Sequence, residues 1–273
     1  MPHAAPQLTR SFAETRAGRL HLASCGDGFP VLLLHQTPRS WDEYRDVLPL
    51  LGARARAVAM DTPGFGDSPP GPAPSIEAWS EAVLALLDWL DIPAACIVGH
   101  HTGAVTAMEV AARAPHRVAA LVLSSCPMVD AARRAHHACH TPIDTVTGAA
   151  DGSHLMRLWD GRRPFYPPGD TDLLGRFMVD ALRAGPMAAE GHRVVNGYRM
   201  EDRIGLVRAP TLVIAATDDP HAFPAARPMA AAIPGATLVE IQGGTVPLPD
   251  AMPDAFSAAV LGFLAQQRLL DAA

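Results

Sequence analysis

The stretch CIVGHHTGAV, residues 96–105, determines how the rest of this chain is expected to fold. Its apolar start predicts a short buried strand, followed by a tight turn and an apolar helix. The central GHHTG, from Gly99 to Gly103, has the frame of a nucleophile elbow, which holds a reactive side chain at a strained strand-to-helix turn. The two glycines fit this reading, because a Cβ beside such a turn would collide with it. At the centre, where a serine is typical, the chain has His101.

Two further motifs follow other apolar runs. VLLLHQTP, residues 31–38, places His35 at the end of a predicted strand, and DTPGFGDS, residues 61–68, begins its turn with Asp61. In order and spacing, the three motifs resemble those of the α/β-hydrolase superfamily, in the capped branch with epoxide hydrolases, haloalkane dehalogenases and ring-cleavage-product hydrolases. In this motif Asp61 is structural and holds its turn through hydrogen bonds to the backbone.

Strands alternate with helices along the chain, which predicts a mostly parallel twisted sheet with helices on both faces, as in an α/β-hydrolase fold. Residues 75–90 form one amphipathic helix of this series, with Ser75 as its N-cap. In such sheets ligands bind beyond the carboxyl ends of the strands. His35, Asp61 and His101 all follow predicted strands, so we expect the site there.

The alternation breaks between residues 127 and 203, where polar helix-like pieces are separated by Gly- and Pro-rich turns. The resembled family inserts a helical cap at this position. We therefore expect one core domain made of residues 1–126 and 204–273, with residues 127–203 as a helical cap insertion.

The composition excludes several classes of function. The formal net charge is −6 and all 22 basic residues are Arg, without a basic run, which argues against nucleic acid and a membrane surface as partners. No secretory signal or membrane-spanning run stands out, and the four cysteines are scattered without framework spacing. We expect a cytoplasmic protein with a small-molecule substrate, and the sequence leaves its oligomeric state open.

A serine triad of this family needs an elbow nucleophile, an acid after a late strand and a histidine after the last strand. By resemblance, Asp219 in ATDD (216–219) is the acid. In QGGTVP (242–247), Thr245 stands where the family has its histidine. Two of the three members are therefore replaced, and the predicted enzyme has an atypical, incomplete triad.

The replacement at the elbow leaves two chemical routes open. Imidazole is largely neutral and nucleophilic near pH 7, so His101 needs no separate base. It could attack an acyl carbon to give an acyl-imidazole, or it could act as a general acid/base without a covalent intermediate. The second route suits C–C cleavage, isomerisation, cyclisation or elimination. A third interpretation is that His101 is a remnant in a protein that binds but does not catalyse.

The remaining candidate residues are assigned by resemblance or by their place beside the elbow. We expect the oxyanion-hole donors to be backbone N–H groups and the substrate to contact polar and aromatic side chains of core and cap. His35 is either structural or a proton relay to His101, and Asp219 either serves the site or only caps the following helix. These residues are catalytic His101, Asp219 and His35; oxyanion-hole Thr37 and Thr102; and substrate-binding Gln36, which replaces the family's glycine, with His100, Trp159 and Thr245.

Alternatives at other histidines are weaker. His221 lies two residues after Asp219 and could supply the missing imidazole. His136 and His140 share one helical face at the spacing of metal ligands, but no third ligand is evident, so we predict no metal. No phosphate-binding loop or dinucleotide fingerprint occurs, and no cofactor is implied.

Three classes of function follow. The first is a cofactor-free α/β-hydrolase-family enzyme acting on a small or medium, apolar organic substrate with a carbonyl or ester-like group. The second is a lyase, isomerase or cyclase that uses His101 as acid/base. The third is a small-molecule-binding protein without activity. The apolar substrate is predicted from cap residues such as Trp159, Phe165 and Phe177, which we expect to line an apolar pocket.

Overall fold

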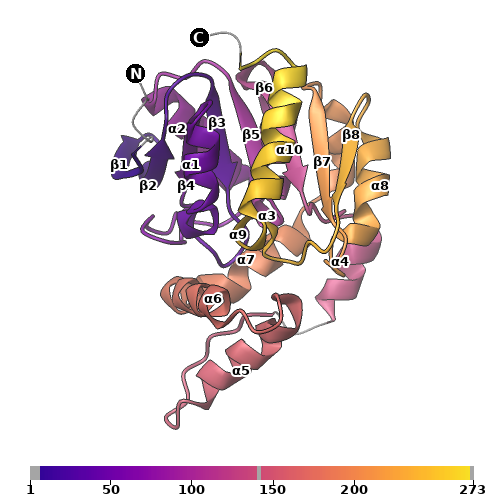
Figure 1. The fold of residues 1–273 in the computed structure, drawn as a ribbon. Helices are drawn as coiled ribbons and strands as arrows, with labels where there is room; N and C mark the ends of the chain where they lie inside the picture. The colour runs from indigo at the N-terminus through magenta and orange to yellow at the C-terminus, as the bar shows by residue number, and fades with distance from the viewer. Residues whose placement is uncertain (1–6, 140–142, 271–273) are drawn as a thin grey trace.

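The computed structural model describes residues 7–139 and 143–270, which form one eight-stranded sheet flanked by helices (Figure 1). The strand order is β1-β2-β4-β3-β5-β6-β7-β8. β2 pairs antiparallel with β1 and β4, and the other neighbours are parallel. The strands are β1 (Thr9–Thr15), β2 (Gly18–Cys25), β3 (Pro30–Leu34), β4 (Arg56–Met60), β5 (Ala95–His100), β6 (Val118–Ser124), β7 (Thr211–Ala216) and β8 (Thr237–Ile241). The predicted α/β-hydrolase fold with a mostly parallel sheet is confirmed.

The central strands are buried on both faces, as their continuous apolar runs predict. In β3, Leu32 and Leu34 pack into one core, and Val31 and Leu33 pack into the other. Helices α2 (Ile76–Trp89), α3 (Thr102–Arg113) and α8 (Phe223–Ala232) cover the first face, while α1 (Val47–Gly52) and α10 (Pro253–Gln266) cover the second. Ser75 caps α2 as predicted, because its Oγ accepts a hydrogen bond from the Ala78 N–H at 3.0 Å.

The segment between β6 and β7 folds as helices that lie beyond one end of the sheet (Figure 1). We call α4 (Ala131–Ala138), α5 (Ser153–Arg162), α6 (Thr171–Ala184) and α7 (Pro186–Gly197) the cap helices. Short helices complete the chain: α9 (Leu248–Ala251), η1 (Trp41–Tyr44), η2 (Pro115–Arg117), η3 (Arg163–Phe165), η4 (Met200–Asp202) and η5 (Ile204–Leu206).

A buried arginine joins the cap helices to the rest of the molecule. Arg39, which follows β3, is fully buried. Its Nε donates to Asp180 of α6 at 2.8 Å, and its Nη1 binds Asp250 of α9. Because the guanidinium contacts a carboxylate on each side, it fixes the position of α6 over the ends of the strands.

Candidate active site

The elbow has the strained geometry that its glycines predict. His101 lies between β5 and α3 with φ 47° and ψ −110°, in the region that L-residues rarely adopt. A Cβ on Gly99 would collide with the Gly103 carbonyl, and a Cβ on Gly103 would collide with the Leu34 carbonyl. The turn therefore requires both glycines, and it presents His101 at the carboxyl end of the sheet.

His101 and Asp219 lie in direct contact. The His101 Nε2 is 2.8 Å from the Asp219 Oδ2, with the His101 side chain 15% exposed and that of Asp219 fully buried. The contact has the distance of an ion pair but not the angles of a hydrogen bond, and neither atom has a hydrogen-bond partner among the described residues. The imidazole at the elbow thus reaches the carboxylate that a separate histidine contacts in a serine triad.

The second oxygen of Asp219 fixes the loop after β7. Its Oδ1 accepts the backbone N–H groups of His221 at 2.9 Å and Ala222 at 3.2 Å. Burial alone would raise the pKa of the carboxyl, but His101 and these N–H groups hold the pKa well below its usual range. Of the two roles considered from the sequence, contact with the site is observed, whereas the Asp219 side chain holds the turn before α8 and not the helix itself, whose N-cap is Ala222. His221 does not supply the imidazole to Asp219, and its ring instead packs on Phe165.

His100 lies behind the elbow and holds the loop that follows β8. Its Nδ1 is 3.0 Å from the Ser124 Oγ, and its Nε2 is 2.8 Å from the Val246 carbonyl. Because a carbonyl only accepts, Nε2 carries the proton and Nδ1 accepts from Ser124. Burial, followed by the charge of His101, lowers the pKa of His100 to about 3. The adjacent Thr245 keeps its Oγ1 buried, with no hydrogen-bond partner among the described residues.

His35 has both ring nitrogens engaged by the backbone. Its Nδ1 donates to the Gln36 carbonyl at 2.8 Å, and its Nε2 accepts the Thr62 N–H at 3.0 Å. These contacts leave no ring nitrogen of His35 to exchange a proton with His101. Of the two roles considered for His35, structural residue or proton relay to His101, these contacts favour the structural role.

The expected oxyanion-hole residues lie next to each other. The Thr37 N–H donates to the Thr102 Oγ1 over a long 3.3 Å, and both residues line the cavity that contains His101. Gln36, in place of glycine, directs its backbone and side-chain N–H groups away from this point, to the buried Glu43 at 2.9 and 2.6 Å. These two hydrogen bonds hold Gln36 in place. Burial of the Glu43 carboxyl raises its pKa to about 8.

The cavity around His101 has a volume of about 990 Å³, and its lining mixes apolar and polar side chains. It lies between the elbow and helices α4, α5 and α7. Its charged and titratable lining residues are five histidines and four arginines: His101, His136, His137, His192, His221, Arg133, Arg134, Arg162 and Arg193. No Asp or Glu is among the described residues that line it. The cavity expected from the sequence to be apolar therefore also carries cationic and titratable side chains.

The cap aromatics pack on one another instead of lining this cavity. Phe177 is buried in a small cluster with Tyr166 and Leu173, and Trp159 and Phe165 pack against that cluster. His100, Thr245 and Trp159, predicted to bind substrate, are absent from the described lining, whereas Gln36 is present. The sequence alone could not distinguish cap residues that pack on one another from cap residues that line a pocket, because large apolar side chains are typical of both positions.

Arg133 is the arginine of this lining that has no carboxylate within 4 Å in the described part of the chain, whereas Arg134, Arg162 and Arg193 pair with Glu201, Asp144 and Glu190. The Nε of Arg133 donates to Asn196 at 3.0 Å, and the residue is half-buried. Burial lowers its pKa. Asp130 and Asp219 act on Arg133 only from a distance, and a half-buried guanidinium without an ion-paired carboxylate favours an anionic ligand.

Other polar clusters outside the His101 cavity are internally satisfied. Asp61 accepts the N–H groups of Trp41 and Asp67 at 2.6 and 2.8 Å, which confirms its structural role, and it lies 2.8 Å from the His21 Nδ1. The carboxylates of Asp61 and Asp67 and the ring of His21 lie close enough to bind a metal ion. However, Arg10 binds both Asp67 and His21, so the cluster is already hydrogen-bonded and charge-compensated.

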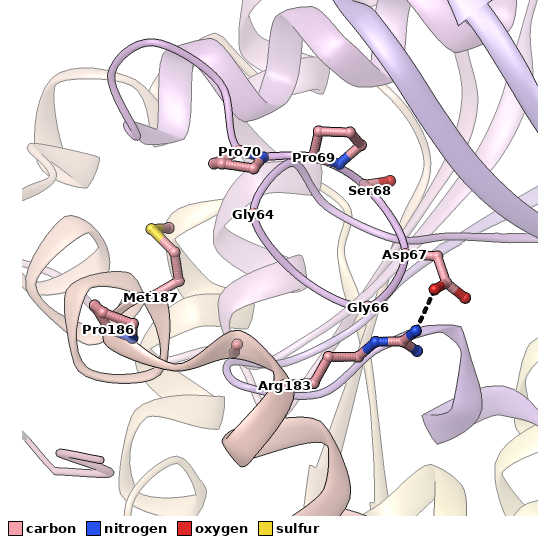
Figure 2. Close-up of a pocket in the computed structure, with 10 residues that line it drawn as sticks. Gly64, Gly66, Asp67, Ser68, Pro69, Pro70, Arg183, Pro186 and Met187 are labelled. Carbon is pink, nitrogen blue, oxygen red and sulfur yellow. Dashed lines mark hydrogen bonds and ion pairs between the residues drawn. The ribbon is translucent and has the colours of Figure 1, made fainter. Parts of the chain in front are cut away.

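A second cleft, of about 570 Å³, lies between residues 64–70 and the junction of α6 with α7. Figure 2 shows Arg183 of α6 reaching Asp67 at its edge. This cleft shares no lining residue with the His101 cavity. The metal pair considered from the sequence, His136 with His140, cannot be compared, because His140 lies outside the described residues.

In the part of the chain that is described, no helix combines the length and apolarity needed to span a bilayer.

Comparison with known proteins points to one family. A family profile described as alpha/beta hydrolase fold matches residues 30–248. "Epoxide hydrolase 2" from Siraitia grosvenorii is 39% identical over 120 residues, which cover 42% of this chain and 38% of that protein. "2-hydroxymuconate semialdehyde hydrolase" from Pseudomonas sp. (strain CF600) is 32% identical over 127 residues, or 45% of this chain and 44% of the relative. The chain thus matches less than half the length of these relatives.

Solved structures match over nearly the whole chain. The enol-lactonase from Burkholderia xenovorans LB400 has a TM-score of 0.77 and 22% identity, covering 93% of this chain and 100% of that one. A hydrolase from Pseudomonas aeruginosa PA01 has a TM-score of 0.79 and 26% identity, covering 94% and 98%. At such identities the likeness concerns the fold.

Proposed function

The chain belongs to the α/β-hydrolase fold family, and from this premise we propose that it is a cofactor-free enzyme that hydrolyses a small carbonyl or ester-like substrate through His101 and Asp219. The observation that carries the proposal is the 2.8 Å contact between the His101 Nε2 and the Asp219 Oδ2. A carboxylate only accepts, so this contact favours the tautomer with the proton on Nε2. The other ring nitrogen, Nδ1, then has a free lone pair for chemistry in the cavity.

Among the two routes open to His101, the general-base route is the better supported. Nδ1 is the ring nitrogen next to the side chain's own Cβ, so an acyl group there would be crowded by the elbow. A water molecule is small enough to approach it. In the proposed step, water forms the new C–O bond while its proton passes to Nδ1 and the carbonyl π pair moves to oxygen. The imidazolium then returns the proton to the leaving alkoxide as the old C–O bond breaks.

Asp219 and the strand ends stabilise the charges that form in this step. The Asp219 carboxylate, without a cation of its own, stabilises the positive charge on His101. The oxyanion is assigned to the backbone N–H groups of Thr37 and Thr102. Thr102 begins α3, where the first N–H groups have no partner within the helix. The 3.3 Å bond from the Thr37 N–H to the Thr102 hydroxyl is long, and we expect an oxyanion to displace it.

We assign an anionic group to the substrate, in place of the apolar one expected from the sequence. The absence of carboxylates among the described lining residues and the lack of a carboxylate within ion-pair distance of Arg133 support this assignment. The planar guanidinium suits a carboxylate, which it can bind through two parallel hydrogen bonds. Substrates with a carboxylate at a distance from the ester would therefore reach His101 and Arg133 together.

The test is turnover of paired activated aryl esters, one bearing a carboxylate and the other the neutral amide of the same size. His101→Ala is expected to lower kcat by about 10³-fold, within the usual range for a general base. Arg133→Gln is expected to raise KM about tenfold for the carboxylate ester and to leave the amide unchanged, whereas Arg157→Gln on the exposed side of α5 changes neither. Equal turnover by wild type and His101→Ala would refute the proposal.

One observation favours the second class, proton transfer without hydrolysis. The Thr37 N–H is already engaged by Thr102, which weakens a tetrahedral oxyanion site but does not affect a base acting on a C–H bond. A lyase or isomerase would use His101 in the same tautomer. If no ester is turned over, hydrogen–deuterium exchange of acidic C–H bonds in carboxylated ketones, abolished by His101→Ala, would support this alternative.

A further inference from the structure

The cap carries a second pairing of a histidine with a carboxylate, built from three of its segments. His192 lies on α7, Asp144 lies between α4 and α5, and Arg162 ends α5. The His192 Nε2 is 2.7 Å from the Asp144 Oδ2, and the Asp144 side chain is only 3% exposed. The arrangement therefore repeats, on the other wall of the cavity, the contact between His101 and Asp219.

Arg162 fixes the charge and tautomer of this pair. Its Nε donates to the Asp144 Oδ1 at 2.6 Å, and its Nη2 binds Oδ2. The Nη2 is also 3.3 Å from the His192 Nε2, which is farther than the carboxylate oxygen. The shorter contact to Asp144 decides the tautomer, so His192 carries its proton on Nε2. Burial would raise the pKa of Asp144, but Arg162 and His192 lower it to about 2.

The free nitrogen of His192 is available to a ligand. His192 lines the same cavity as His101, with its side chain 17% exposed. Its Nδ1 has no hydrogen-bond partner among the residues that the structure describes. Burial lowers the pKa of His192, and the charge of His101 adds to this effect, so the two imidazoles interact electrostatically. His192 is thus a neutral imidazole with a free lone pair.

We infer that His192, oriented by Asp144 and Arg162, is a second proton-transfer residue of the His101 cavity. The inference rests on the proposed hydrolysis, in which the attacking water loses two protons at neutral pH. His101 carries the first proton to the leaving alkoxide. The second remains on the carboxylic acid product until it ionises. The His192 Nδ1 accepts this second proton as the O–H bond of the acid breaks, and releases it to solvent, which leaves a carboxylate product and a neutral His192.

The test compares His192→Gln with wild type on the paired esters. The glutamine amide can still donate to Asp144 but cannot take up a proton. Because His192 acts after the bond-forming step, we expect kcat to fall only about tenfold, with KM changed less than twofold. The exposed His116 provides a matched control, and His116→Gln is expected to leave both constants unchanged. A kcat of His192→Gln within twofold of wild type, while His101→Ala is inactive, refutes the inference and leaves the proposed function intact.

A second measurement does not depend on turnover. In ¹⁵N-histidine NMR spectra of the full chain at pH 7, the His192 Nδ1 is expected to be unprotonated and to shift when benzoate, a product carboxylate, is added. Asp144→Asn should abolish the fixed tautomer. If wild type hydrolyses no ester, the proposed function fails while this spectrum still decides the inference. A protonated Nδ1 in wild type would overturn the role of His192.

Discussion

The two pairs, His101 with Asp219 on the core and His192 with Asp144 on the cap, have similar distances and differ in charge, and only the cap pair meets hydrogen-bond geometry. Both direct Nε2 to a buried carboxylate, at 2.8 and 2.7 Å. Asp219 receives its other hydrogen bonds from neutral backbone N–H groups. Asp144 receives two from the guanidinium of Arg162.

This difference predicts different chemistry from the same residue types. An uncompensated carboxylate stabilises a positive charge as it forms on the imidazole, which suits His101 as the base of the first step. A carboxylate already neutralised by arginine offers less to an imidazolium, which together with burial keeps His192 neutral at rest. In both pairs the contact with the carboxylate sets the tautomer of the histidine. The other donors to the carboxylate, backbone N–H groups at Asp219 and the Arg162 guanidinium at Asp144, determine how readily each histidine takes up a proton.

The largest effect is expected from neutralising the core carboxylate. Asp219→Asn keeps an oxygen for the His221 and Ala222 N–H groups, but places an N–H₂ or an uncharged oxygen opposite the His101 Nε2. The imidazole loses both its fixed tautomer and the stabilisation of its charge. We expect kcat to fall about 10³-fold, equivalent to about 4 kcal/mol, in steady-state kinetics on the carboxylate ester.

Asp144→Asn is the matched variant on the cap and should lower kcat only about tenfold, because His192 acts after the bond-forming step. Equal losses in the two variants would mean that the pairs are not divided between the two proton transfers. Urea denaturation of both variants would establish that the kinetic changes do not reflect unfolding.

The sequence predicted the core pair's positions but not their contact. The motif spacing indicates that His101 and Asp219 both follow strands of one sheet. That the elbow imidazole spans the distance to Asp219 depends on side-chain length and on the turn at φ 47°, which motif spacing does not encode. Two sequence features together could have indicated this contact. The elbow carries a histidine, which is longer than the usual serine, and Thr245 replaces the histidine that would otherwise contact Asp219.

The cap pair could not be predicted from the sequence. Asp144 and His192 are 48 residues apart in a region without strand register, so no motif fixes their relative position. Phe177 and Trp159 were expected to line an apolar pocket but pack in the cap's own cluster, because large apolar side chains suit a helix core as well as a pocket wall. The sequence likewise does not show that Arg133 lacks an ion-paired carboxylate, because this depends on Glu201 and Asp144 pairing with Arg134 and Arg162 in the folded chain.

Removing the cation from the cap pair should make it resemble the core pair. Arg162→Gln leaves Asp144 buried without a cation and with His192 as its remaining partner, at a cost of about 3 kcal/mol in the free energy of unfolding. The charge of Arg162 lowers the pKa of His192, so we expect that pKa to rise in the variant. NMR titration of His192 and urea denaturation measure the two effects.

Arg163→Gln, on the neighbouring residue, is the control. The Arg163 side chain is 69% exposed and 3.7 Å from Asp160, so its loss should change the free energy of unfolding by less than about 0.5 kcal/mol. An unchanged His192 pKa in Arg162→Gln would show that the cation does not distinguish the two pairs.

The smallest expected effect is the acid dependence of stability contributed by Asp144. Its pKa in the folded state is about 2, below its ordinary value of 3.8, so the ionised carboxylate stabilises the fold above pH 3.8 and this contribution is lost as the pH falls toward 2. The shift corresponds to about 2 kcal/mol. In urea denaturation from pH 6 to pH 3, the free energy of unfolding of wild type should therefore exceed that of Asp144→Asn by an amount that falls by about half over this range. The lowered pKa of His192 also removes stability as the pH falls below 6.5 in both proteins. A difference between the two proteins that stays constant from pH 6 to pH 3 would mean that Asp144 stabilises the cap through packing and hydrogen bonds alone, and that its charge is not what holds His192 and Arg162 in place.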